Sequence, residues 1–236
     1  MKNLCFAIFV VISFILFPLS TSTSAVEMSA GVSTWYTKWV FADNDNMKMD
    51  PAFMFGPALS LRFSDNWSIA GVFLYGRFNQ KESDSSDGGP SKISRYDSDI
   101  SLNYNFNRYF KIFGGGKLLA FTWEEDGTTR KHWSMGPGLG LGTTLPITNN
   151  IFFLFNVSGT YTKGNHENGS GKPDDKLTET GVNTTAAFAY YIASASTSIN
   201  LGFRYQYIHI NYDKETDSKD EGMRFYGVTL SAVYSF

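Results

Sequence analysis

The C-terminal stretch Phe225-Tyr-Gly-Val-Thr-Leu-Ser-Ala-Val-Tyr-Ser-Phe236 decides the fold. Its residues alternate between two kinds. The even positions are all apolar or aromatic: Tyr226, Val228, Leu230, Ala232, Tyr234 and Phe236. The odd positions from Phe225 to Ser235 are mostly small. A period of two predicts a β-strand with one apolar face, because successive side chains of a strand point to opposite sides.

The same alternation recurs upstream. Between Ile199 and Tyr207 the odd positions are aliphatic or aromatic, and the even ones include Gly202 and Arg204. Between Arg95 and Phe106 the odd positions are charged or polar and the even ones largely apolar. A soluble sandwich would turn the greasy face toward a core, whereas a membrane barrel turns it toward lipid and allows a polar interior. The continuous polar face favours the barrel.

The alternation predicts ten strands, with eight as the alternative if the segments 28–41 and 109–123 prove to be loops. The expected strands are 28–41, 52–63, 67–78, 93–106, 109–123, 132–146, 151–163, 177–192, 197–210 and 223–236. The links 64–66, 107–108, 147–150 and 193–196 are short, whereas 42–51, 79–92, 124–131, 164–176 and 211–222 are long and polar. Short turns at one end and long loops at the other are typical of an up-and-down transmembrane barrel.

Residues 1–25 have the pattern of a secretory signal peptide. Lys2 precedes an apolar run from Leu4 to Phe17, and small residues lead to a cleavage site after Ala25. The alternative, an uncleaved anchor helix, is disfavoured because a membrane-spanning helix needs about 20 apolar residues. The only cysteine lies in this segment, so the mature chain, 26–236, has no thiol.

The composition agrees with a barrel: aromatic residues make up 17% of the chain and glycine contributes 22 residues. From Val26 to Phe236 the chain resembles the bacterial outer-membrane β-barrel superfamily. Tyr234 and Phe236 resemble the terminal aromatic signal read by the barrel-assembly machinery. The resemblance implies secretion to a bacterial outer membrane and contact with the lipid bilayer and lipopolysaccharide. A net charge of −2 does not indicate a nucleic-acid partner.

Charged side chains in the inward phase of the strands are the candidate functional residues. The predicted lumen charge network comprises Arg62, Arg95, Asp97, Asp99, Lys117, Glu179 and Arg204. In a narrow lumen such charges are costly unless paired, so the simplest interpretation is a set of ion pairs that closes the barrel. The alternative is a selectivity ring in a narrow pore.

Glycine is concentrated in the strand 132–146, where Gly136, Gly138, Gly140 and Gly142 share one face. We expect this face to point inward. Glycine there could open space for a ligand, or it could make room for large residues opposite, such as Trp35 or Trp39.

Two short motifs raise the question of catalysis. Asp97-Ser-Asp99 resembles half of an omptin protease site, but Tyr207 stands where an acid should precede His209. His132-Trp-Ser134 resembles the His-x-Ser pair of barrel-class lipid A deacylases. Met135 replaces the asparagine expected after that serine, and no Glu follows on the same strand. We therefore expect no catalytic residues.

The long links are acidic, and the stretch Asp43-Asn-Asp-Asn46 begins like a calcium loop. It lacks the glycine and distant Glu of such a loop, so we expect no metal site and no cofactor. The sequence predicts a non-catalytic barrel that supports the envelope or makes surface contacts through its acidic loops. A narrow channel for ions or small polar solutes is the second hypothesis, and a lipid A-modifying or omptin-like enzyme is the third.

Overall fold

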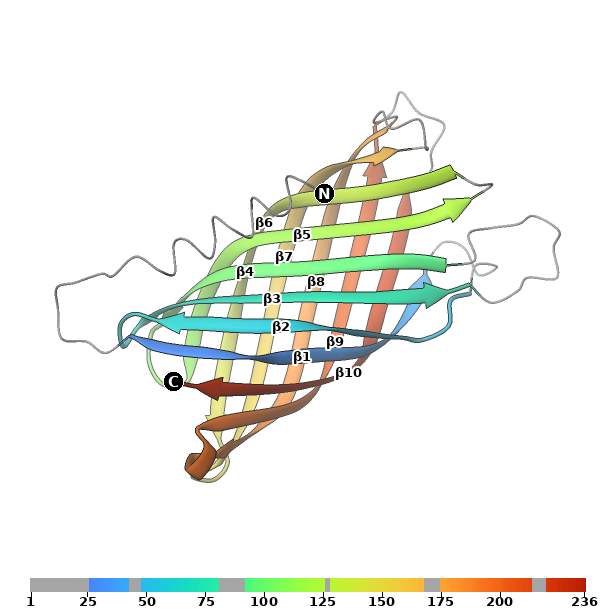
Figure 1. The fold of residues 1–236 in the computed structure, drawn as a ribbon. Coiled ribbons are helices and arrows are strands. Elements are labelled where there is room, and N and C mark those ends of the chain that lie inside the picture. The colour runs from blue at the N-terminus through green and yellow to red at the C-terminus, as the bar shows by residue number, and fades with distance from the viewer. Residues whose placement is uncertain (1–25, 43–47, 81–91, 126–127, 168–174, 214–219) are drawn as a thin grey trace.

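A computed structural model describes residues 26–42, 48–80, 92–125, 128–167, 175–213 and 220–236. They form an all-β, closed antiparallel barrel in which each strand pairs with its neighbours in sequence, and β1 pairs with β10 to close the ring (Figure 1). The strands are β1 (Glu27–Phe41), β2 (Ala52–Arg62), β3 (Trp67–Asn79), β4 (Lys92–Asn105), β5 (Phe110–Glu125), β6 (Thr128–Pro146), β7 (Ile151–Glu167), β8 (Asp175–Ile192), β9 (Thr197–Tyr212) and β10 (Glu221–Ser235). The predicted count of ten strands is confirmed. The residues proposed as signal peptide lie outside the described ranges.

The apolar faces of the strands point outward. Phe53, Leu102, Phe203, Leu230 and Tyr234, all predicted to face lipid, are 43–56% exposed on the outer surface. Arg95 and Arg204, predicted to face the lumen, are 0% and 6% exposed. The predicted facing is therefore confirmed. Among the described residues, no helix has the length and apolarity needed to cross a membrane.

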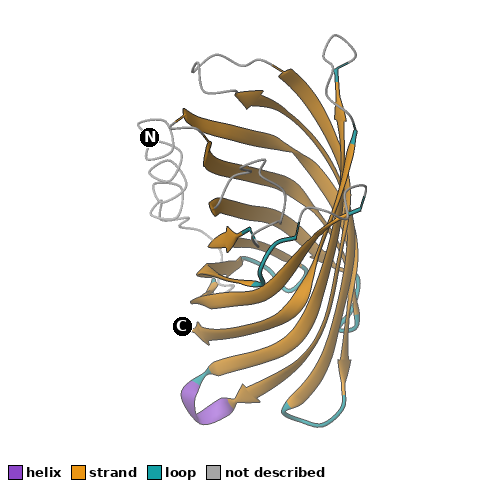
Figure 2. Cartoon of the chain, turned by 90° about the vertical axis from the view of Figure 1, so that its right-hand side faces the viewer, coloured by secondary structure: helices purple, strands orange, loops and turns teal. Residues whose placement is uncertain are grey.

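Short turns join the strands at the end of the barrel that carries the C-terminus, here called the turn end (Figures 1 and 2). Polar side chains fix three of them locally. The backbone N–H groups of Trp67, Tyr109 and Ile151 donate to the side-chain oxygens of Ser64, Asn107 and Thr148. The fourth turn is a short 3-10 helix, Ala193–Ala195. At the opposite end, the loop end, lie the long links, much of which falls outside the described residues.

One predicted long link, 124–131, is wrong. β5 and β6 continue pairing as far as Glu125 and Thr128, so only two residues separate these strands. Thr128 and Thr129 are β-branched residues that favour an extended strand, and the alternation continues through Arg130 and Lys131. The polarity of this segment predicts a loop, but polarity does not distinguish a loop from a strand that projects beyond the membrane.

The inside of the barrel has two distinct halves. On the loop side the inward residues form a buried hydrophobic cluster, which includes Trp35, Trp39, Met54, Leu74, Phe78, Ile93, Leu119, Phe121, Ile210 and Phe225. On the turn side the inward positions are mostly small and polar, for example Ser29, Ser33, Ser60, Asn200 and Ser231. A polar interior is thus confirmed only for the turn side. The loop side is filled like the core of a soluble protein.

The glycines of β6 face inward as predicted, but they make room for residues that differ from those expected. A Cβ on Gly140 would lie 2.4 Å from Phe113 Cζ, and one on Gly142 would lie 2.6 Å from Lys111 Cε. Both neighbours stand on the adjacent strand β5, not on β1 with Trp35 and Trp39. Gly140 and Gly142 therefore make room for large side chains of the adjacent strand β5.

Candidate functional site: the lumen charge network

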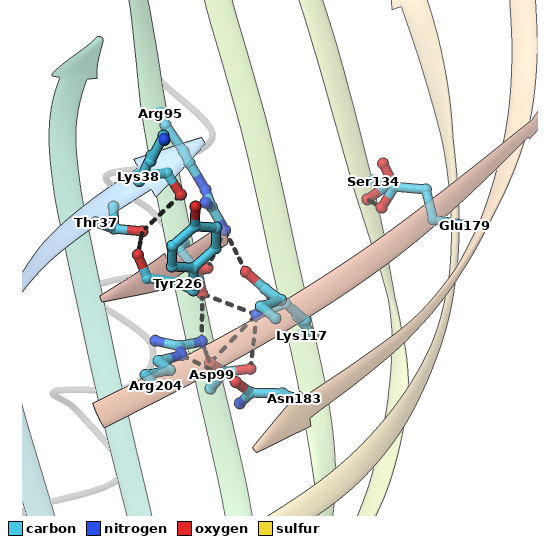
Figure 3. A network of polar contacts seen from close by, with 12 residues as sticks. Thr37, Lys38, Arg95, Asp99, Lys117, Ser134, Glu179, Asn183, Arg204 and Tyr226 are labelled. Carbon is cyan, nitrogen blue, oxygen red and sulfur yellow. Dashed lines mark hydrogen bonds and ion pairs between the residues drawn. The ribbon is translucent and has the colours of Figure 1, made fainter. Parts of the chain in front are cut away.

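Asp97 of β4 is the centre of the charge network. Its partners Arg95, Lys117 and Arg204 are labelled in Figure 3. The side chain is fully buried, and its two carboxylate oxygens accept hydrogen bonds from three cations. Arg95 Nη2 lies 2.6 Å from Oδ2, whereas Lys117 Nζ and Arg204 Nη2 lie 2.8 and 3.5 Å from Oδ1. The carboxylate thus offsets much of the cost of burying positive charge here.

Asp99 extends the network toward the turn side. Lys117 Nζ and Arg204 Nη2 approach its carboxylate to 3.1 and 3.4 Å, and its side chain remains one-third exposed. Arg204 Nε also donates to Asn183 Oδ1 at 3.0 Å, and Arg95 Nη2 donates to Gln206 Oε1. Each of the two aspartates therefore joins Lys117 of β5 to Arg204 of β9.

The network spans the lumen. In the closed ring four strands separate β4 from β9 in either direction, so these two strands stand on opposite walls. The contacts of Arg204 with Asp97 and Asp99, and that of Arg95 with Gln206, all connect β4 to β9. Side chains from opposite walls therefore meet in the middle of the barrel.

Aromatic rings cover the network on the loop side. The Arg95 guanidinium lies 3.6 Å from the ring centre of Phe225, and the ring of Trp35 lies 5.3 Å from Arg95 and 4.5 Å from Arg204. Such cation–π contacts contribute about 2 kcal/mol or more when desolvated. The aromatic faces give Arg95 a favourable contact where it has few hydrogen-bond acceptors.

Two of the seven predicted residues do not belong to this network. Arg62 lies at the turn end of β2, where its side chain is 55% exposed and pairs with Glu27 at 3.2 Å. It has the inward phase, but the lumen opens to solvent at that height. Glu179 does face the lumen, yet it takes part in a separate polar cluster (Figure 3).

Glu179 of β8 joins the two residues of the His-x-Ser motif. His132 Nε2 lies 2.6 Å from Glu179 Oε1, and Ser134 Oγ donates to Oε2. Thr162 Oγ1 also donates to Oε2, at 2.8 Å. The sequence does not predict this cluster, because Glu179 reaches the pair from two strands away, across β7, and only the strand register brings them together.

The arrangement differs from that of a catalytic triad. In a triad the base contacts the nucleophile and the acid orients the base. Here the carboxylate stands between the two, contacting His132 and Ser134 through different oxygens. All three side chains are at most 4% exposed. Such an arrangement satisfies buried polar groups and ties β6, β7 and β8 together.

The omptin-like residues are separated in space. Asp97 and Asp99 point into the lumen, where cations bind them, whereas His209 belongs to the outward phase of β9 with Phe203 and Tyr207. The described residues contain no group of three His, Cys, Asp or Glu side chains that could hold a metal ion. Residues 43–46, which begin like a calcium loop, lie outside the described ranges.

The terminal aromatic residues lie on the outer surface at the turn end. The rings of Tyr234 and Phe236 meet edge to face with their centres 4.9 Å apart, and Phe236 N donates to Met28 O. Their role as an assembly signal remains a prediction.

Comparisons with solved structures agree with this fold. The outer membrane protease OmpT from Escherichia coli matches with a TM-score of 0.52 and 12% identity, over 92% of this chain and 100% of that one. An outer membrane channel from Pseudomonas putida gives 0.45 and 11%, over 94% and 100%. The attachment invasion locus protein Ail of Yersinia pestis gives 0.38 and 14%, over 90% and 100%. No protein-family model and no curated protein matches the chain.

The closed barrel with an apolar outer surface has the architecture of a transmembrane β-barrel, and OmpT shares this fold. At 12% identity the likeness shows the fold alone. The role of this protein must therefore be argued from the residues of this chain.

Proposed function

We propose that this protein is a non-conducting, non-catalytic barrel that supports the outer membrane and makes surface contacts through its acidic loops. The observation that carries the proposal is the occluded lumen. Arg95 and Arg204 reach across from opposite walls to Gln206 and Asp97, and a hydrophobic cluster fills the barrel on the loop side of them. The surface-contact role rests on the acidity of the long links, most of which lie outside the described residues.

The packing of the hydrophobic cluster on the loop side supports a closed lumen. Trp39 is 3% exposed, and its ring packs against Phe41, Phe78, Phe121 and Phe225 with ring centres 4.9–5.3 Å apart. An ion crossing this layer would lose its hydration without gaining polar ligands, which is strongly unfavourable. The aromatic layer therefore acts as a barrier independently of the ion pairs beneath it.

Burial of the polar clusters supports the absence of catalysis. Ser134 is 0% exposed and donates to Glu179, so a substrate would have to displace buried, hydrogen-bonded groups to reach it. Asp97 is likewise enclosed by three cations. Lipid A from cells that express the protein should have the same mass as lipid A from cells that express Ser134→Ala. A mass difference that depends on Ser134 would contradict this part of the proposal.

A narrow channel is the second candidate, and the turn-side half of the lumen favours it. Its inward residues are mostly small and polar, with Lys111 and Phe113 as large exceptions, and they leave a largely polar lining below the network. A channel would require the aromatic layer to open. Liposome swelling with small polar solutes separates the two functions: a closed barrel gives the rate of protein-free liposomes, whereas a faster rate with the wild-type protein supports the channel.

A further inference from the structure

Two of the three histidines of the chain form a pair across adjacent strands near the loop end. His132 of β6 and His166 of β7 are direct partners in the strand register, and their ring centres lie 6.2 Å apart. Side chains at such positions have Cβ atoms about 4.5–5.5 Å apart and point to the same face of the sheet. Because metal–nitrogen bonds are about 2.0–2.1 Å long, one ion can bind both imidazoles after a small rotation of the rings.

Glu179 orients His132 for this role. Its Oε1 lies 2.6 Å from His132 Nε2, while Oε2 accepts hydrogen bonds from the hydroxyls of Ser134 and Thr162. An ionised carboxylate can only accept, so Nε2 carries the proton and Nδ1 of the neutral ring keeps a lone pair. Among the described residues, nothing hydrogen-bonds to this Nδ1. Histidines that bind metals almost always donate through their other ring nitrogen to a carboxylate, a carbonyl or water, as His132 does here.

His166 makes the pair accessible from the loop end. It is the next-to-last residue of β7 and is partly exposed, whereas His132 is 3% exposed. The rings of Trp123 and Tyr212 lie 5.4 and 6.4 Å from the His166 ring, and both pack against the hydrophobic cluster. An imidazole has two ring nitrogens, so a hydrogen bond at one of them leaves the other able to bind a metal.

We propose that His132 and His166 together bind one divalent transition-metal ion, with Cu²⁺ held more tightly than Zn²⁺. Imidazole suits both ions, and the affinity of nitrogen sites for divalent metals is greatest for Cu²⁺. Two protein ligands leave the remaining coordination positions to water. The loops of transmembrane barrels are usually longer on the extracellular side, so the site faces metal from outside the cell. It goes beyond the proposed function and does not depend on whether the lumen is closed.

The third histidine provides the matched control. His209 belongs to the outward phase of β9, so His209→Gln removes an imidazole and leaves the pair intact. His166→Gln is the main variant, because His166 is only partly buried. His132→Gln removes the other ligand, but it also removes a contact with Glu179. Heat-modifiable gel mobility therefore checks that each variant folds.

The tag-free, detergent-folded protein would be titrated with CuCl₂ and with ZnCl₂ by calorimetry, and Cu²⁺ binding would also be followed by tryptophan fluorescence. We expect one Cu²⁺ per chain and quenching of Trp123, whose ring lies beside His166. His166→Gln should weaken Cu²⁺ binding at least about tenfold, because loss of an outer hydrogen-bond partner alone usually costs about 10–100-fold. His209→Gln should bind like the wild type.

Three results would overturn the proposal. The first is the absence of saturable Cu²⁺ binding to the wild-type protein. The second is an equal loss of affinity in His166→Gln and His209→Gln, which would mean that Cu²⁺ binds histidines individually. The third is wild-type affinity in a folded His132→Gln protein, since one imidazole would then be sufficient.

Discussion

The loop-side and turn-side halves of the lumen carry different types of residue, although the same ten strands form both halves. The loop side contains Trp39, Phe78 and Phe225 in mutual contact, whereas most inward positions on the turn side carry small or polar residues such as serine, asparagine and glycine. Between them the ion pairs of Asp97 join opposite walls. One half of this barrel is therefore packed like the core of a soluble protein, and the other half is not. We expect the packed half to account for most of the stability of the protein and for the closure of its lumen.

Removal of the Trp39 ring from the hydrophobic cluster should have the largest effect on the free energy of unfolding. Trp39→Ala deletes contacts with four aromatic rings, and the cavity left should lower the free energy of unfolding by about 3–5 kcal/mol. Urea unfolding in lipid vesicles measures this. A loss below about 1 kcal/mol would show that the loop side is not a packed core.

Neutralising the central carboxylate should cost nearly as much. Asp97→Asn leaves three buried cations without their shared anion, and breaking a buried pair in this way costs about 3–5 kcal/mol. Asp99→Asn is the control, since Asp99 is one-third exposed and water can replace its charge. If the two variants lost the same free energy of unfolding in this assay, Asp97 would not be shielded from water at the centre of the network.

The lipid-facing surface provides the third test. Leu230→Arg places a charge against the hydrocarbon and should cost about 2–4 kcal/mol at mid-membrane depth. Ser231→Arg, one residue further along β10 but facing the lumen, should cost about 1 kcal/mol or less, because inward substitutions avoid the lipid. Equal stability of Leu230→Arg and the wild type would reverse the assigned facing of this strand.

The smallest effect is expected on the turn side. Ser33 faces the half-buried part of the lumen, between Ser231 and Gly56 in the strand register. Ser33→Ala should change the unfolding free energy by no more than about 0.5 kcal/mol, as is usual for substitutions outside packed regions. A loss comparable to that of Trp39→Ala would remove the contrast between the two halves.

Periodicity was sufficient to predict the barrel, since one buried and one lipid-facing side force a period of two along each strand. It also predicted that Arg95, Asp97, Asp99, Lys117 and Arg204 share the lumen. Periodicity did not predict the hydrophobic cluster of the loop side, although the sequence contains a signal for it. Near the loop end both faces of a strand become apolar, as in Leu118-Leu119-Ala120-Phe121 and Trp39-Val40-Phe41. Continuous apolar runs in a barrel strand indicate burial on both faces.

The grouping of the charges could not be predicted. Which partner a buried carboxylate meets depends on the register of strands far apart in sequence, as for Glu179 with His132 and Ser134. Arg62 shows a second limit: phase alone assigns it to the lumen, but its height on β2 takes it out to solvent beside Glu27.

Single-channel recording in planar bilayers tests most directly whether the lumen is closed. The purified wild-type protein should give no stable conductance steps, because the aromatic layer and the ion pairs of opposite walls occlude it. The double variant Trp39→Ala/Arg204→Ala, which opens both barriers, should give steps if it folds, and circular dichroism with heat-modifiable gel mobility checks folding. Stable, voltage-independent steps from the wild-type protein would contradict the account.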